Sequence, residues 1–141
     1  MNAIRQWLRR NSSELHYSST VADEVQFQGL RSKASSVTIN RRQSYQTRLV
    51  SALHECGHVL IHARRRNDKK RRVAGCSFNE FWHGRGRRKH AVRLKLSTLQ
   101  EEIAAWDQGE VLARRLGIRY TRKVFERCRA RALLTYARDC K

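Results

Sequence analysis

The sequence predicts an α+β fold, in which a small sheet packs on a pair of long helices and one further helix lies at each end of the chain. Apolar residues recur every three or four positions over residues 44–66 and 98–116, which is the spacing of amphipathic helices. Between residues 15 and 40, β-branched and aromatic residues alternate with polar ones, which is typical of strands. The 141 residues contain no proline, which favours long helices, and they suit a single domain over residues 1–141.

The first part of the chain is expected to form a short helix and a sheet. The helix covers residues 3–10, where Ile4, Trp7 and Leu8 share one face. Three strand-like stretches follow it, at residues 15–20, 24–30 and 36–40. A glycine and a polar segment separate the last two stretches, as the turn of a hairpin would, so we expect the sheet to be antiparallel.

The first long helix, residues 44–66, leads into a strongly basic segment. Residues 64–95 hold thirteen Lys and Arg against two acids, so more than half of the net charge of +19 lies in under a quarter of the chain. We interpret residues 64–97 as a basic insert in the domain. Its last part, residues 91–97, alternates apolar and basic residues and is expected to be a half-buried strand.

The second long helix is expected to begin at Ser97 or Thr98, either of which can cap it, and to end at Gly117. Its first turn would then hold Glu101 and Glu102, where the helix dipole favours anions. A last helix is expected to follow Thr121 and to run to the end of the chain.

The excess of basic residues, 31 Lys and Arg against 12 Asp and Glu, predicts a polyanionic partner. Nucleic acid is the commonest polyanion, and an acidic protein fits the same charge. The alternative is a solvated charged loop whose aromatic side chains pack on the domain. The cations expected to contact nucleic acid are those of the basic insert: Arg64, Arg65, Arg66, Lys69, Lys70, Arg71, Arg72, Arg85, Arg87, Arg88 and Lys89.

Neither membrane insertion nor secretion is expected. No stretch approaches the roughly 18 apolar residues that a membrane helix needs, so no membrane span is predicted. The four cysteines form no C-x-x-C pair, and no secretory signal precedes them. They are therefore expected to be reduced thiols in a cytoplasmic protein, which could associate with the nucleoid.

His54, Glu55 and His58 form the pattern H-E-x-x-H within the first long helix. One helical turn separates the two histidines, so both imidazoles project from one side and can share a tetrahedral Zn²⁺ ion. Glu55 is displaced around the helix, near enough to take a proton from a water that the metal activates. On a helical wheel the histidines lie opposite the apolar stripe, and Gly57 beside them allows another backbone to approach. We therefore expect a zinc site with Glu55 as general base.

A catalytic zinc ion needs a third protein ligand, and the second long helix offers four acids. Glu102 shares a face with the small residues Ala105 and Gly109, so another helix could pack closely there and the carboxylate would be buried. Glu102 is the expected ligand, and Glu101 at the edge of that face is the second choice. Alternatively, neither glutamate binds a metal, and both are present because negative charge in the first turn of a helix interacts favourably with the helix dipole.

Three segments together resemble the ImmA/IrrE-like zinc metallopeptidases: VTIN at 37–40, LHECGHVLIH at 53–62 and EIAAWDQGEVLA at 102–113. The family pattern is a strand ending I-x-I-N, a helix with H-E-x-G-H-x-L-x-H and a second helix opening E-x-x-A-x-x-x-A. The resemblance covers about a third of the chain. It implies His54, His58 and Glu102 as zinc ligands and Glu55 as general base.

The chain departs from the family pattern in three ways. The segment between the histidines and the downstream glutamate is longer than is typical, because the basic insert lies there. In the second helix, Trp106 and Gln108 stand where small polar and bulky apolar residues are more usual, and Gly109 replaces the second alanine. SprT-like proteases, which also combine H-E-x-x-H with DNA association, are a looser resemblance that depends on the motif and the charge.

Two classes of function remain at this point. The first is a zinc-dependent metallopeptidase with a protein substrate, which acts near nucleic acid or on an acidic or DNA-bound protein. The second is a basic nucleic-acid-binding or protein-binding module with a structural or inactive zinc site. Glu55 favours the enzyme, because a purely structural site has no use for an uncoordinated carboxylate beside the metal. The residue that stabilises the oxyanion stays open among His62, His83, His90, Tyr120 and Tyr136.

Overall fold

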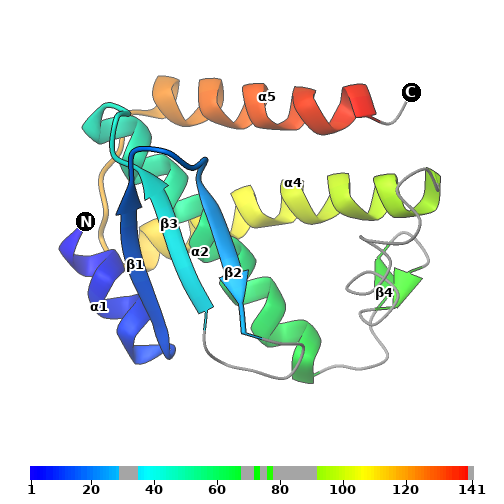
Figure 1. The fold of residues 1–141 in the computed structure, drawn as a ribbon, viewed down its shortest axis with the longest axis horizontal. Helices are drawn as coiled ribbons and strands as arrows, with labels where there is room; N and C mark the ends of the chain where they lie inside the picture. Colours follow the sequence, from blue (N-terminus) through cyan, green and yellow to red (C-terminus); the bar gives the residue numbers. More distant parts are fainter. Residues whose placement is uncertain (29–34, 68–71, 74–75, 78–91, 140–141) are drawn as a thin grey trace.

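The computed structural model describes residues 1–28, 35–67, 72–73, 76–77 and 92–139. In chain order they form α1 (Asn2–Arg10), β1 (Ser13–Ser18), β2 (Glu24–Phe27), β3 (Ser35–Asn40), α2 (Tyr45–Asn67), β4 (Arg72–Val73), β5 (Cys76–Ser77), α4 (Val92–Arg115) and α5 (Arg122–Asp139) (Figure 1). The predicted α+β fold is confirmed.

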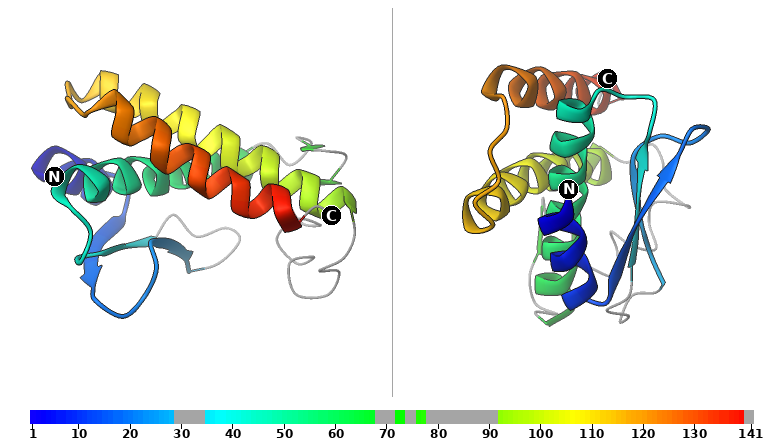
Figure 2. Two further views of the ribbon diagram at one scale, coloured as in Figure 1. Left: turned by 90° about the horizontal axis from the view of Figure 1, so that it is seen from above. Right: turned by 90° about the vertical axis from the view of Figure 1, so that its left-hand side faces the viewer.

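Helix α2 is the central layer of the molecule. The sheet and α1 cover one side of it, and the antiparallel pair α4 and α5 lies on the other (Figure 2). Residues 49–59 are therefore buried on every side of the helix. The apolar stripe expected on α2 is confirmed at Leu49, Leu53 and Cys56, whereas Tyr45 at its start is 52% exposed. A helix enclosed in this way carries polar residues into the interior, where they must find partners.

The sheet is mixed, with β3 in the centre. β2 and β3 pair in antiparallel fashion, as the predicted hairpin requires, but β1 pairs with β3 in parallel. The expectation of a fully antiparallel sheet is thus wrong for β1, because β3 enters between the two earlier strands. Val37 and Ile39 of β3 are fully buried against α2, and the central strand is the most buried of the three.

Helix α4 begins about one and a half turns earlier than expected. Residues 92–97 form its start and not a strand, so neither Ser97 nor Thr98 caps the helix. Leu94 and Ser97 are buried at helical spacing, while Val92 is 62% exposed, so the alternation in this segment does not reflect a sheet. The C-terminal end agrees with the prediction: Gly117 has a φ of 63°, and the N–H of the next residue closes the Schellman motif on Ala113 O at 2.9 Å.

A second apolar cluster joins α2, α4 and α5. Val50, Trp106 and Phe125 form it, and Phe125 is fully buried. On the outside of the helix pair, Arg129 of α5 lies 2.9 Å from Asp107 of α4. This packing fixes the N-terminal half of α5 on the other two helices.

Among the described residues, no helix has the length and apolar character that crossing a bilayer would require. The cysteines in this part of the chain, Cys56, Cys76 and Cys128, form no disulfide with one another.

Candidate metal centre

Helices α2 and α4 cross with their backbones in contact. A Cβ atom on Gly57 would lie 2.0 Å from Ala105 O, and one on Gly109 would lie 2.5 Å from Leu53 O. Only glycine fits at either position, so each helix contributes one glycine to the crossing. The close approach predicted from the small residues of both helices is confirmed, and it brings Glu102 of α4 to the histidines of α2.

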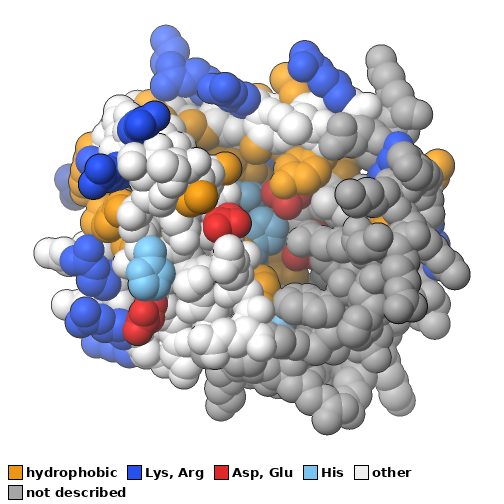
Figure 3. All heavy atoms as spheres, in the orientation of Figure 1, with side chains coloured by type: hydrophobic (Ala, Val, Ile, Leu, Met, Phe, Trp, Pro, Cys, Tyr) orange, Lys and Arg blue, Asp and Glu red, His pale blue; other side chains and the backbone are white. Residues whose placement is uncertain are grey.

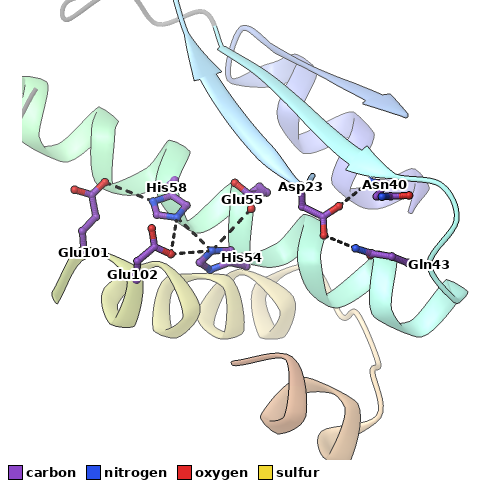
Figure 4. Close-up of polar contacts among 8 residues, drawn as sticks. All are labelled: Asp23, Asn40, Gln43, His54, Glu55, His58, Glu101 and Glu102. Atoms are coloured by element: carbon purple, nitrogen blue, oxygen red, sulfur yellow. Dashed lines mark hydrogen bonds and ion pairs between the residues drawn. The ribbon is translucent and has the colours of Figure 1, made fainter. Parts of the chain in front are cut away.

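His54, His58 and Glu102 meet at this crossing (Figure 4). His54 Nε2 lies 3.3 Å from His58 Nε2. Glu102 Oε2 lies 3.3 Å from the first of these nitrogens and 3.5 Å from the second. A tetrahedral zinc ion with bonds of about 2.0–2.1 Å holds its ligand atoms roughly 3.3–3.4 Å apart. The three buried side chains therefore fit one metal ion.

The charges of this group are tightly coupled in the metal-free protein. Burial lowers the pKa of His54. Burial also opposes the protonation of His58, but hydrogen bonds to Glu101 and Glu102 outweigh it and raise the pKa of His58 to about 10. Burial alone would raise the pKa of Glu102, whereas the two imidazoles hold it well below its usual range. An ionised Glu102 thus faces a protonated His58 until a metal replaces the proton.

Glu101 lies on the opposite side of His58 from Glu102. Its Oε1 atom is 3.5 Å from His58 Nδ1, and its side chain is buried. Because α4 starts at Val92, neither glutamate stands in the first turn of the helix, so the alternative of a dipole interaction does not apply. The structure therefore brings Glu102 to the ligand atoms and Glu101 to the outer nitrogen of one ligand, the position from which carboxylates orient metal-bound imidazoles.

Glu55 lies beside the group without joining it. Its Oε1 atom is 3.8 Å from His54 Nε2, and its side chain is 6% exposed. Burial raises the pKa of Glu55 to about 7, with His58 acting in the opposite sense and Glu102 adding to the rise. A carboxyl group with this pKa both accepts and releases a proton near neutral pH.

Trp106 covers the metal group from the side of α4 and was not predicted as part of it. Its indole stacks on the imidazole of His54, with ring centroids 4.3 Å apart and an interplanar angle of 21°. Phe125 of α5 packs edge-on against the same indole. His54 Nδ1 has no hydrogen-bond partner among the described residues, so stacking holds this ring where a carboxylate holds that of His58. Trp106 could have been predicted to lie near the metal group, because it is one helical turn after Glu102.

The metal group opens into a cleft of about 390 Å³, which we call the metal cleft. Figure 3 shows carboxylate and imidazole side chains at the bottom of a hollow in the centre of this face. Glu102 and Trp106 lie at the base of the metal cleft, and α2 and α5 form its walls. The lining residues are Asp23, Gln43, Thr47, Ser51, His54, Glu55, Glu102, Trp106, Cys128, Arg131, Ala132, Thr135 and Tyr136.

Of the five residues left open as oxyanion stabilisers, only Tyr136 lines the metal cleft within the part of the chain that the structure describes. His62 stacks on Phe27 with ring centroids 4.0 Å apart and lines a separate pocket. Tyr120 donates a hydrogen bond to a glutamate at the far end of α4. The other two candidates, His83 and His90, lie outside the described residues.

The predicted nucleic-acid contacts lie almost entirely outside the described side chains. Arg64, near the end of α2, is exposed. The remaining ten cations fall among residues whose side chains are not described: Arg65, Arg66, Lys69, Lys70, Arg71, Arg72, Arg85, Arg87, Arg88 and Lys89.

In comparisons with protein-family models, with curated proteins and with solved structures, the chain matched none of them.

Proposed function

We propose that the protein is a zinc-dependent metallopeptidase, as the resemblance to ImmA/IrrE-like enzymes implies. The observation that carries the proposal is the arrangement of His54, His58 and Glu102, whose ligand atoms lie 3.3–3.5 Å apart beside an uncoordinated carboxylate and an open cleft. Two imidazoles and one carboxylate are the donor set of many hydrolytic zinc sites, and three protein ligands leave one position for water or substrate.

Zinc in this position would polarise a peptide carbonyl and lower the pKa of a water molecule. The residues of the chain supply the remaining requirements. Glu55 accepts the proton of the water and returns it to the leaving amine, for which a pKa of about 7 is suitable. Trp106 and Glu101 hold the two histidine rings in position from opposite sides.

The shape of the metal cleft suits an extended peptide. Cys128, Ala132 and Tyr136 line it at a spacing of four residues, so one face of α5 follows the cleft for eight residues. At a rise of about 1.5 Å per residue this face is roughly 12 Å long, the length of three to four residues of extended chain. Thr47, Ser51 and Glu55 line the wall formed by α2 at the same spacing. A peptide between these walls would pass over the metal group.

The proposal is tested with two variants of the zinc-loaded protein. Glu55→Gln keeps the size and the hydrogen-bonding capacity of the side chain but cannot act as a base. It is expected to bind zinc as the wild type does and to lose peptide cleavage. His54→Ala is expected to lose both. Cleavage that survives in Glu55→Gln, or wild-type protein that binds no zinc, would refute the proposed mechanism.

A second candidate is a basic binding module in which zinc has a structural role. The ligands come from two helices, so an ion would also cross-link α2 and α4. The net charge of +19 suits nucleic acid or an acidic protein as partner, in the cytoplasm or on the nucleoid. Nucleic-acid affinity that falls steeply with salt, and less steeply after neutralisation of residues 64–72, together with zinc-dependent stability and no cleavage, would favour this candidate.

A further inference from the structure

Asp23 lies in the metal cleft and forms no ion pair with any described residue. It directly precedes β2 and is half-buried. Among the described acids, Asp107, Glu110 and Glu126 each pair with an arginine, whereas Asp23 does not. Because no described cation pairs with the Asp23 carboxylate, its negative charge is available to a ligand in the metal cleft.

The carboxylate of Asp23 is held in a fixed orientation. Oδ1 accepts a hydrogen bond from Asn40 N at 2.6 Å, and Oδ2 accepts one from Gln43 Nε2 at 2.6 Å (Figure 4). A carboxylate offers about four acceptor positions, so these two donors use half of them. The group is thereby oriented without being saturated, and it can accept hydrogen bonds from a bound molecule.

Besides the metal group and Glu55, the charged side chains among the described residues that line the metal cleft are Asp23 and Arg131. A zinc ion with two positive charges would balance Glu55 and Glu102. Across the cleft, on α5, Arg131 is the one cation among the described lining residues.

We propose that Asp23 selects substrates with a positively charged group, an ammonium or guanidinium, beside the bond that is cleaved. This inference rests on the proposed peptidase function and names the substrate class of that site. The net charge of +19 repels strongly cationic chains at long range. The substrate is therefore a neutral or acidic protein segment with a single basic residue, or a free amino terminus, at the metal cleft.

The variant Asp23→Asn separates this role from a structural one. The amide oxygen of asparagine can still accept the hydrogen bond from Asn40 N. Gln43 Oε1 is buried without a hydrogen-bond partner among the described residues. If the Gln43 amide rotates by about 180°, this oxygen would accept a hydrogen bond from the side-chain NH₂ of the new asparagine, in place of the bond that Gln43 Nε2 donates to Asp23. The charge is lost and the contacts are kept. Glu24→Gln is the matched control, because it makes the same change of charge one residue away, at a side chain that does not line the cleft.

The test uses the full zinc-loaded chain and decapeptides that are neutral apart from one scanned position, which is Lys or Gln. Capped and free amino termini distinguish a side chain from a terminal ammonium as the recognised cation. We expect the kcat/KM of the best Lys peptide to exceed that of its Gln counterpart roughly tenfold, as for a partly buried charged hydrogen bond. Asp23→Asn should abolish this ratio while Glu24→Gln keeps it. A ratio that persists in Asp23→Asn, or an equal loss for both peptides, would overturn the inference.

A measurement of peptide binding distinguishes failure of this inference from failure of the proposed function. The same peptide pairs are titrated against zinc-loaded Glu55→Gln, with and without Asp23→Asn. If no peptide is cleaved by the wild type but Lys peptides bind more tightly than Gln peptides in an Asp23-dependent manner, the peptidase function fails and the cation subsite stands. Equal binding of both peptides, or no binding of either, overturns the subsite.

Discussion

Replacement of Gly57 by alanine is expected to disrupt the metal centre without changing any of its ligands. The added Cβ atom would lie 2.0 Å from Ala105 O, 2.7 Å from its carbonyl carbon and 2.9 Å from its Cα. All three atoms belong to the backbone of α4, so no side-chain rotation relieves the overlap. Because Cβ contacts below 3.0 Å essentially do not occur, the two helices must separate by about 1 Å.

The size of the effect follows from the position of Glu102, less than one turn before Ala105. A separation of 1 Å would lengthen the distances from Glu102 Oε2 to the two imidazoles from 3.3 and 3.5 Å to roughly 4.3 and 4.5 Å. A tetrahedral zinc ion spans only about 3.3–3.4 Å between ligand atoms. Zinc affinity should therefore fall roughly 100-fold, and the free energy of unfolding of the metal-free protein should fall by about 1–3 kcal/mol.

The assay is a zinc competition titration combined with denaturant unfolding of the metal-free protein. Gly117→Ala is the control for loss of a glycine, because no described residue other than Gly117 and its chain neighbours has an atom within 4 Å of the position of its Cβ. Its positive φ should cost about 1 kcal/mol of stability while zinc affinity stays unchanged. If Gly57→Ala binds zinc and unfolds like the wild type, α2 and α4 do not cross as described.

Three further predictions concern the surroundings of the metal group. Glu101→Gln should weaken zinc binding about 10–100-fold in the same titration, because His58 loses the carboxylate on its outer nitrogen; unchanged affinity would contradict this role. Since the pKa of His58 is about 10 without metal and a ligand must be neutral, zinc binding at pH 7 should release at least about one proton, and affinity should rise with pH towards 10. Calorimetry in buffers of different ionisation enthalpy measures this release, and its absence would refute the assigned charge state. Phe125→Ala should lower the free energy of unfolding by about 3–5 kcal/mol, since Phe125 is fully buried against Trp106; a loss below 1 kcal/mol in denaturant unfolding would mean that α5 is not packed there.

Local patterns predicted the helices better than the pairing of the strands. Helical spacing over two long segments, and glycine at the end of the second, carry their information within a few residues, and those elements agree with the structure except at the start of α4. Strand pairing depends on contacts between distant segments, so the parallel partner of β1 could not be predicted from its own residues. The alternation at 91–97 was misleading for a related reason. A helix with one buried side also places some apolar residues two apart, and only burial shows which of them face inward.

The candidate metal ligands could be selected from the sequence because their geometry is helical. His54 and His58 are one turn apart, and Glu102 shares its face with two small residues that permit a close crossing. Asp23 could not be found in this way, because it lies outside any helix and reaches the metal cleft through the path of the chain into β2. Stacking of Trp106 on His54 likewise depends on the angle at which α2 and α4 cross.

X-ray absorption spectroscopy at the zinc edge tests the metal centre most directly. For the zinc-loaded full chain, we expect one ion with two imidazole nitrogens from His54 and His58, one oxygen from Glu102 and one further light atom, all at about 2.0–2.1 Å. His54→Ala should lose the ion. A sulfur ligand at about 2.3 Å, or wild-type protein that takes up no stoichiometric zinc, would refute the proposed zinc site.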